Sequence, residues 1–266
     1  MDQLDREIIK TREYGSQFGV VYSSNELKKR LISSQKYSDE ILLKKLKSYK
    51  SVKITSKSIF TKSKLEKVEN FINQLAKFFP DILMVTVTGS VAAGYCREND
   101  DIDLMIITRQ NRLWINRLLL RLYVSLHKIP HRKFGLRENK DDLCFNLWIE
   151  EGEMKLPKNK QTLRNAMDTI LMVPILNKES TYEKFLAEND WVGKFVRNRY
   201  EELLGDFKWD RSKTRTGFDL ISIINWLVFW PQWWYMKGKI SSEVVGLRTA
   251  FFHPSDRIRY ASEDNW

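Results

Sequence analysis

Residues 85–108 read VTVTGSVAAGYCRENDDIDLMIIT, and this stretch decides the fold that the chain can adopt. An apolar, β-branched run over 82–88 predicts a buried strand, which Gly89 and Ser90 break. Acidic residues then lead directly into a second apolar run over 102–108, which predicts a neighbouring buried strand. Glycine lets the backbone approach a phosphate closely, and the N–H groups that open a following helix face an anion. The stretch therefore predicts two strands joined through an anion-binding turn.

Asp101 and Asp103 stand at the start of the second predicted strand. Side chains two positions apart on a strand project from the same face, so both carboxylates can point at one place. Such carboxylates repel each other unless a cation neutralises them, and hard oxygen ligands that leave room for phosphates suit Mg²⁺. Metal on the paired aspartates and a triphosphate on the Gly89-Ser90 turn form the arrangement of phosphoryl or nucleotidyl transfer.

The sequence around this stretch predicts a small mixed sheet packed with helices, in the α/β (α+β) class. Helices are expected over 61–80 and 113–127, and a third buried strand over 143–149. The order helix, strand, turn, strand, helix, strand is typical of helices layered on a sheet. From about residue 161 onward the pattern is mostly helical.

In these residues the chain resembles the DNA polymerase β-like nucleotidyltransferase superfamily, whose pattern is a strand, Gly-Ser, roughly ten residues, and Asp-x-Asp on an apolar strand. The resemblance covers about residues 61–150. It implies that Gly89 and Ser90 hold the phosphates of an NTP, and that Asp101 and Asp103 hold Mg²⁺, as one ion or two. The segments TGSVAAG, DDIDLMIIT, CFN and FFHP are also similar to a prokaryotic branch described only as nucleotidyltransferase-domain proteins.

The family pattern places a third carboxylate in the middle of the next strand, as a metal ligand and proton acceptor. Asn146 stands at that position here, and an amide can coordinate a cation but cannot accept a proton near neutral pH. Three interpretations stay open. The site uses two carboxylates with Asn146 as a neutral ligand, or Asp142 or Glu150, expected on the same strand face, replaces the missing acid. In the third, the site binds a nucleotide without transferring it.

Three regions are expected along the chain. Residues 1–60 form a winged-helix-like or plain helical module, residues 61–160 the nucleotidyltransferase core, and residues 161–266 a helical region. The winged-helix interpretation rests on predicted helices followed by an alternating stretch over 51–60, which suggests a wing. The charge-free segment 220–236 is short for a membrane span, so we expect a buried core helix, with a lipid-interface helix as the alternative.

Charge favours a polyanionic partner. The 266 residues include 45 Lys and Arg against 34 Asp and Glu, a formal net charge of +11. Two segments are strongly basic, from Lys44 to Lys64 and from Arg109 to Arg137, and they would suit nucleic acid. Arg109 is expected to bind the triphosphate, with a surface charge as the equal alternative. Few cysteines and no secretory signal at the start lead us to expect a cytoplasmic protein.

Two functions are compatible with this sequence. The first is a Mg²⁺-dependent enzyme that transfers NMP from an NTP, ATP among them, to an acceptor, with Asp101, Asp103 and Asn146 as its catalytic residues. The second is a catalytically degenerate transferase fold that serves as a nucleic-acid-binding or regulatory module. Asn146 is the residue on which the choice depends.

Overall fold

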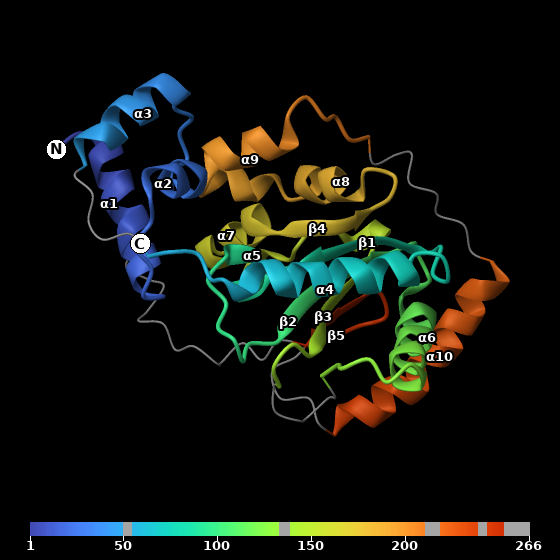
Figure 1. Cartoon of the computed structure of the whole chain (residues 1–266). Helices are drawn as coiled ribbons and strands as arrows, with labels where there is room; N and C mark the ends of the chain where they lie inside the picture. Colours follow the sequence, from blue (N-terminus) through green and yellow to red (C-terminus); the bar gives the residue numbers. More distant parts are fainter. Residues whose placement is uncertain (50–54, 133–138, 211–218, 239–243, 253–266) are drawn as a thin grey trace.

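A mixed sheet forms the centre of the chain, and the three strands predicted around the aspartates are confirmed. The computed structural model describes residues 1–49, 55–132, 139–210, 219–238 and 244–252 (Figure 1). The strands are β1 (Ile82–Val87), β2 (Ile102–Thr108), β3 (Leu143–Glu150), β4 (Val173–Asn177), β5 (Val244–Val245) and β6 (Thr249–Phe251). Their order across the six-stranded sheet is β4-β1-β2-β3-β6-β5. The fold is therefore mixed α+β, as the sequence predicts.

Helices cover both faces of this sheet. They are α1 (Gln3–Ser16), α2 (Ser24–Arg30), α3 (Asp39–Ser48), α4 (Phe60–Leu75), α5 (Gly89–Ala93), α6 (Leu113–Leu126), α7 (Leu163–Leu171), α8 (Thr181–Glu188), α9 (Arg197–Leu204) and α10 (Leu220–Lys237). Short 3₁₀ turns lie at η1 (Glu151–Glu153), η2 (Lys158–Lys160) and η3 (Asp190–Lys194). One apolar core joins the sheet to α4, α6 and α10, and a second joins its other face to α7, α8 and α9 (Figure 1).

The central strand β2 is buried on both faces. Leu104, Met105, Ile106 and Ile107 are all fully inaccessible to solvent, which explains why this strand reads as an uninterrupted apolar run rather than an alternating one. β2 pairs antiparallel with β1 and parallel with β3. A parallel pair requires a crossover connection, and α6 supplies it. The parallel strands β2 and β3 therefore begin at the same end of the sheet.

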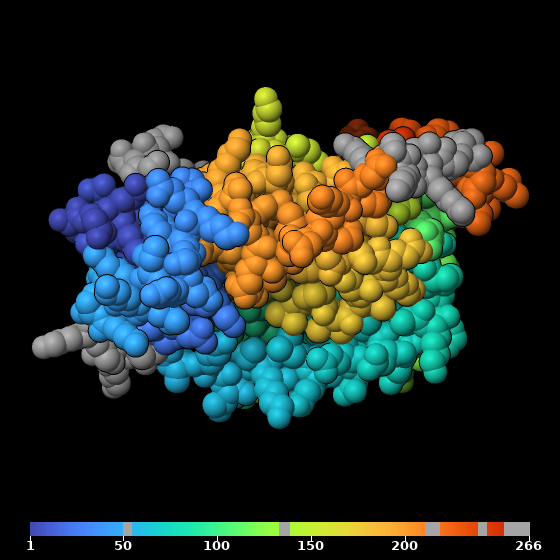
Figure 2. Space-filling model, turned by 90° about the horizontal axis from the view of Figure 1, so that it is seen from above, coloured from blue at the N-terminus to red at the C-terminus, as the bar shows by residue number. Residues whose placement is uncertain are grey.

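The N-terminal helices α1, α2 and α3 have a small apolar core of their own. They lie beside α9 at one end of the molecule, as both views show (Figure 1, Figure 2). Of the segment expected to form a wing, residues 50–54 lie outside the described residues, and residues 55–59 contain no strand. The winged-helix interpretation and the boundary at residue 60 remain predictions.

The expectation of a mostly helical region over 161–266 missed that this region, beside its helices α7, α8, α9 and α10, also supplies both edges of the sheet. β4 lies beside β1, and β6 with β5 extends the sheet beyond β3. Pro174 lies within β4. Proline lacks the N–H that a central strand needs, so its presence is compatible with an edge position. Helix α7 correspondingly ends at Leu171, before β4 begins.

The expectation that 220–236 is a buried core helix is also wrong. In α10 only Ser222, Asn225, Phe229 and Met236 are buried, and this side faces α6. The opposite side exposes large apolar residues: Leu220, Ile221, Ile223, Ile224, Trp226, Leu227, Trp230, Trp234 and Tyr235. Within the part of the chain that the structure describes, no helix has both the length and the apolar character to cross a membrane.

Candidate active site

The turn between β1 and α5 is built directly against an aspartate of β2. Gly89 has φ +66°, a left-handed conformation that favours glycine. A Cβ at this position would lie 2.6 Å from Asp103 Oδ2, so no larger residue fits without displacing the carboxylate. The N–H of Thr88 also donates to the carbonyl of Asp103, at 2.9 Å. The two halves of the predicted motif are therefore in contact.

Ser90 is held by Asp100, a loop residue that is not among the predicted site residues. Its Oγ donates to Asp100 Oδ2 at 2.9 Å, and the N–H of Arg97 donates to the same oxygen at 2.8 Å. Asp100 thereby closes the loop between α5 and β2. In this conformation the Ser90 hydroxyl fixes the turn, and the spacing of Ser90 to the acidic run is the only sequence signal for it.

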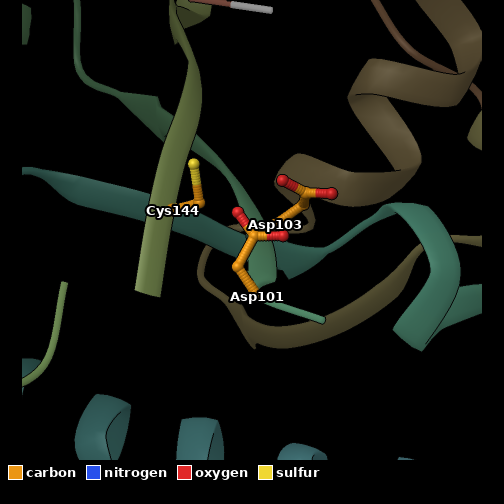
Figure 3. Close-up of side chains that lie close together, drawn as sticks. All are labelled: Asp101, Asp103 and Cys144. Atoms are coloured by element: carbon orange, nitrogen blue, oxygen red, sulfur yellow. The ribbon is translucent and has the colours of Figure 1, made fainter. Parts of the chain in front are cut away.

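Among the described residues, Asp101, Asp103 and Cys144 form a group that could hold a metal ion. One ligand atom from each residue lies within 4.8 Å of the others, at the start of β2 and β3 (Figure 3). Arg132 Nη1 lies 3.9 Å from Asp101 Oδ2 and 3.5 Å from Cys144 Sγ, so the Arg132 guanidinium borders this group. Cys144 was not among the predicted site residues, although strand alternation places it on the same face as Asn146.

Asn146 lies at a bulge of β3, on the same strand face as Cys144. Phe145 lies opposite Leu104 and Leu147 opposite Met105, which leaves Asn146 without a partner on β2. Its Nδ2 donates to Asp103 Oδ1, and its Oδ1 accepts a hydrogen bond from Cys144 Sγ at 2.8 Å. The residue in the family's third position therefore touches the paired carboxylates, as a neutral amide.

Residues 65–188 match the family model of the nucleotidyltransferase domain. These residues belong to the DNA polymerase β-like nucleotidyltransferase superfamily. In the same comparisons no curated protein and no solved structure matched the chain. The match extends well past β3 and takes in β4 and α8, and it contains every residue of the metal-ligand group described above.

The bulge moves Glu150 away from the nucleotidyltransferase site, so the idea that it replaces the missing acid is wrong. One extra residue reverses the alternation that follows it, and Glu150 points to the other face of the sheet. There its Oε1 accepts from the N–H groups of Arg112, at 3.1 Å, and Leu113, at 3.3 Å, and caps α6. Burial raises the pKa of this carboxyl group, whose side chain is inaccessible to solvent.

Asp142, the other proposed replacement, lies just before β3, and its side chain makes a hydrogen bond within the turn there. Its carboxylate accepts a hydrogen bond from Asn139 Nδ2 at 3.0 Å. It is not one of the acidic and thiol groups whose ligand atoms lie within 4.8 Å of one another. Among the described residues, neither candidate for a third carboxylate joins Asp101 and Asp103.

Arg109 lies at the opposite end of β2 from the aspartates. It lies six positions after Asp103 along an extended strand, which is about 20 Å. Its guanidinium pairs with Glu179, and its Nε lies 3.6 Å from Asp81 Oδ1. The structure does not bring Arg109 to the Gly89-Ser90 turn, and we leave it out of the nucleotide site.

Lys64 fixes the loop that carries the aspartates. It was expected to belong to a basic surface, but only 1% of this residue is exposed. Its Nζ donates to the carbonyls of Glu98, at 3.1 Å, and Asp100, at 2.6 Å, and to Asp141 Oδ1, at 2.6 Å. The lysine of α4 therefore holds both the loop before β2 and the turn before β3.

The two basic segments do not form one exposed surface in the described residues. Lys64 is buried, and Lys45 pairs with Asp2 and Asp5. In the second segment Arg112 pairs with Asp219, and Arg117 is buried between α6 and α10. The end of that segment, over 133–137, lies outside the described residues. Nucleic-acid binding through these segments remains a prediction.

Proposed function

We propose that this nucleotidyltransferase domain transfers a nucleoside monophosphate from an NTP to an acceptor, with Mg²⁺ held by Asp101 and Asp103. The observation that carries the proposal is the contact between the Gly89 turn and Asp103. A Cβ at Gly89 would lie 2.6 Å from Oδ2, so the anion-binding backbone and the metal-binding carboxylate adjoin each other. Transfer of a nucleotidyl group needs a metal and a phosphate held side by side.

The residues present suit a divalent cation. Two carboxylates and a thiol lie within 4.8 Å of one another, and Asn146 adds an amide whose oxygen becomes a ligand if the amide turns over. When bound, Mg²⁺ would neutralise charge on the phosphates in the transition state. We assign Asp101 and Asp103 as its ligands, since Mg²⁺ prefers oxygen. Burial, together with both aspartates, raises the pKa of the Cys144 thiol, which suits its role as hydrogen-bond donor to Asn146.

The turn of Gly89 and Ser90 would orient the triphosphate. Glycine leaves the backbone N–H groups open to a phosphate. The hydrogen bond from Ser90 to Asp100 fixes the turn. The proposed division of labour is simple. The turn positions the nucleotide, Asp101 and Asp103 hold the cation, and Asn146 orients Asp103.

The experiment supplies ATP, GTP, CTP or UTP, each labelled at the α-phosphate, together with Mg²⁺ and a cell extract as the source of acceptors. Release of pyrophosphate and transfer of label are measured for the wild type and for the double variant Asp101→Asn with Asp103→Asn. Asp81→Asn is the matched control, because Asp81 lies at the opposite end of the sheet beside Arg109. We expect activity in the wild type and the control only. Equal release by the double variant would exclude the proposal.

Asn146 favours one alternative, which is binding of the nucleotide without transfer. An amide cannot take the proton of an attacking hydroxyl near neutral pH, and no third carboxylate joins the described site. This second function predicts Mg²⁺-dependent NTP binding that is lost in the same double variant. It also predicts that the wild type, the double variant and the control all release no pyrophosphate. Titration calorimetry with each NTP separates it from the first function.

A further inference from the structure

Two arginines lie one helical turn apart on the side of α6 that faces α10. Only 4% of Arg117 is exposed, and Arg121 is partly buried. Residues four apart on a helix are neighbours, and like charges at this spacing repel each other. An arginine side chain stays protonated in proteins, so both positive charges persist in this interior position.

Among the described residues, the contacts of Arg117 are with uncharged groups. Nη1 donates to Gln232 Oε1 at 2.5 Å, and Nη2 lies 3.2 Å from Met236 Sδ. The guanidinium carbon lies 4.7 Å from the centre of the Phe252 ring and 5.4 Å from that of Trp114. Its buried Nε has no hydrogen-bond partner among the described residues. The aromatic faces attract the cation, but they supply no negative charge.

Neither arginine pairs with a carboxylate in the part of the chain that the structure describes. Other arginines nearby do so, since Arg112 pairs with Asp219 and Arg132 lies 3.9 Å from Asp101. Burial lowers the pKa of Arg117, and the charge of Arg121 lowers it further. Burial also lowers the pKa of Arg121. Buried charges in proteins are normally paired, and the described residues supply no counter-charge for this pair.

We propose that Arg117 and Arg121 form a binding site for a phosphate-type oxyanion between α6 and α10. Guanidinium groups bind phosphate oxygens through paired N–H donors, and Arg117 Nε is a donor with no other partner among the described residues. A bound oxyanion would remove the repulsion between the two cations. This site does not require the transfer reaction, and no residue of the metal-ligand group belongs to it.

Two sources of such an oxyanion fit the surroundings. The neighbouring outer side of α10 is apolar and contains exposed Trp226, Trp230 and Trp234, a composition typical of helices at a lipid interface. A phospholipid headgroup is therefore one source, and a free or substrate-borne phosphate is the other. The chemistry that the arginines recognise is the same in both.

The test measures thermal unfolding in EDTA with increasing inorganic phosphate, against chloride at equal ionic strength. For the wild type we expect the melting temperature to rise by about 3 °C when phosphate reaches ten times its dissociation constant. Arg121→Met removes the repulsion, so it should melt at or above the wild-type temperature without phosphate and lose the response to phosphate. Arg117→Met should also lose the response. Arg164→Met, at an exposed position on α7, should keep it.

Two further measurements identify the source and separate this site from the transfer site. Sedimentation with phosphatidylglycerol vesicles, against phosphatidylcholine, shows a lipid headgroup if binding depends on Arg121 but not on Arg164. The double variant Asp101→Asn with Asp103→Asn should respond to phosphate as the wild type does, whether or not transfer occurs. The proposal is overturned if the wild type and Arg121→Met respond alike to phosphate and bind vesicles alike.

Discussion

Asn146 determines what the site can do, because its amide touches Asp103. It lies on the strand face of Cys144, at the residue of β3 that has no partner on β2. Removing a positioned general base typically lowers a rate by about 100-fold or more. A site with an amide in this place should therefore transfer slowly, and the deficiency can be repaired.

We expect Asn146→Asp to raise the rate of Mg²⁺-dependent pyrophosphate release by about 100-fold, because it adds a proton acceptor beside Asp103. Asn146→Leu is the matched variant, which loses both hydrogen bonds without adding charge and should release less than the wild type. Steady-state kinetics at several Mg²⁺ concentrations measure the effect. A rate for the Asp variant no higher than for the Leu variant would show that this position does not face the reacting hydroxyl.

Gly89→Ala tests the contact between the turn and the carboxylate. Its added Cβ would lie 2.6 Å from Asp103 Oδ2, and we expect NTP affinity to fall at least tenfold as the aspartate is displaced, a cost of about 1.4 kcal/mol. Gly19→Ala is the control, because Gly19 has a similar φ of +70° but no atom within 4 Å of the new Cβ. Both variants carry the same backbone strain. Calorimetric titration should show a loss of affinity at Gly89 alone.

At the scale of the element, the sequence predicted what local patterns determine and missed what distant contacts determine. Mostly apolar runs identified β1, β2 and β3, because a strand buried on both faces has few polar positions. The bulge in β3 has no recognisable sequence pattern, so the assumption of regular alternation predicted the wrong face for Glu150. The strands β4, at one edge, and β6, next to the other edge, are short and depend on pairing with β1 and β3.

Glu150 should make stability depend on pH. Its native pKa lies above the ordinary value of 4.5, so the folded chain holds this proton more tightly than the unfolded chain. The free energy of unfolding contributed by this group therefore falls as the pH rises from about 4.5 through the raised pKa. Glu150→Gln keeps an acceptor for α6 and should show a flatter profile. Urea unfolding between pH 4.5 and 8 measures both proteins, and parallel profiles would contradict the assignment.

Lys64 connects elements that are distant in the sequence. Lys64→Met removes three hydrogen bonds and leaves Asp141 with Lys67 as its remaining cation. We expect the free energy of unfolding to fall by about 3 kcal/mol, since one partner of a buried pair is lost. Lys62→Met, on the same helix but exposed, should change it by less than about 0.5 kcal/mol. Similar values for the two variants in urea unfolding would mean that the loop does not depend on Lys64.

At the scale of the whole molecule, the helical N-terminal unit contacts the core at the end of α5, the short helix that begins at the Gly89-Ser90 turn. Arg30 of α2 donates to the carbonyl of Ala93, the last residue of α5, at 2.8 Å. Its guanidinium also lies over the rings of Tyr22 and Tyr95. The sequence predicted this unit but not its attachment, because a contact between residues 63 positions apart leaves no local pattern.

A metal ion that binds the folded protein, and not the unfolded chain, should raise the free energy of unfolding. At a hundred times its dissociation constant, a divalent cation adds about 3 kcal/mol to the free energy of unfolding, or roughly 5–10 °C in melting temperature. We expect EDTA to reverse this rise in the wild type and in Asp81→Asn. The double variant Asp101→Asn with Asp103→Asn should show no rise, because both carboxylates of the group are replaced by amides. Differential scanning calorimetry with Mg²⁺ and with Mn²⁺ measures the shifts, and an equal rise in the double variant would place the metal elsewhere. The variant Cys144→Ser then tests whether the thiol is a ligand. If the sulfur coordinates the metal, the loss of this soft ligand should weaken the binding of Mn²⁺ more than that of Mg²⁺.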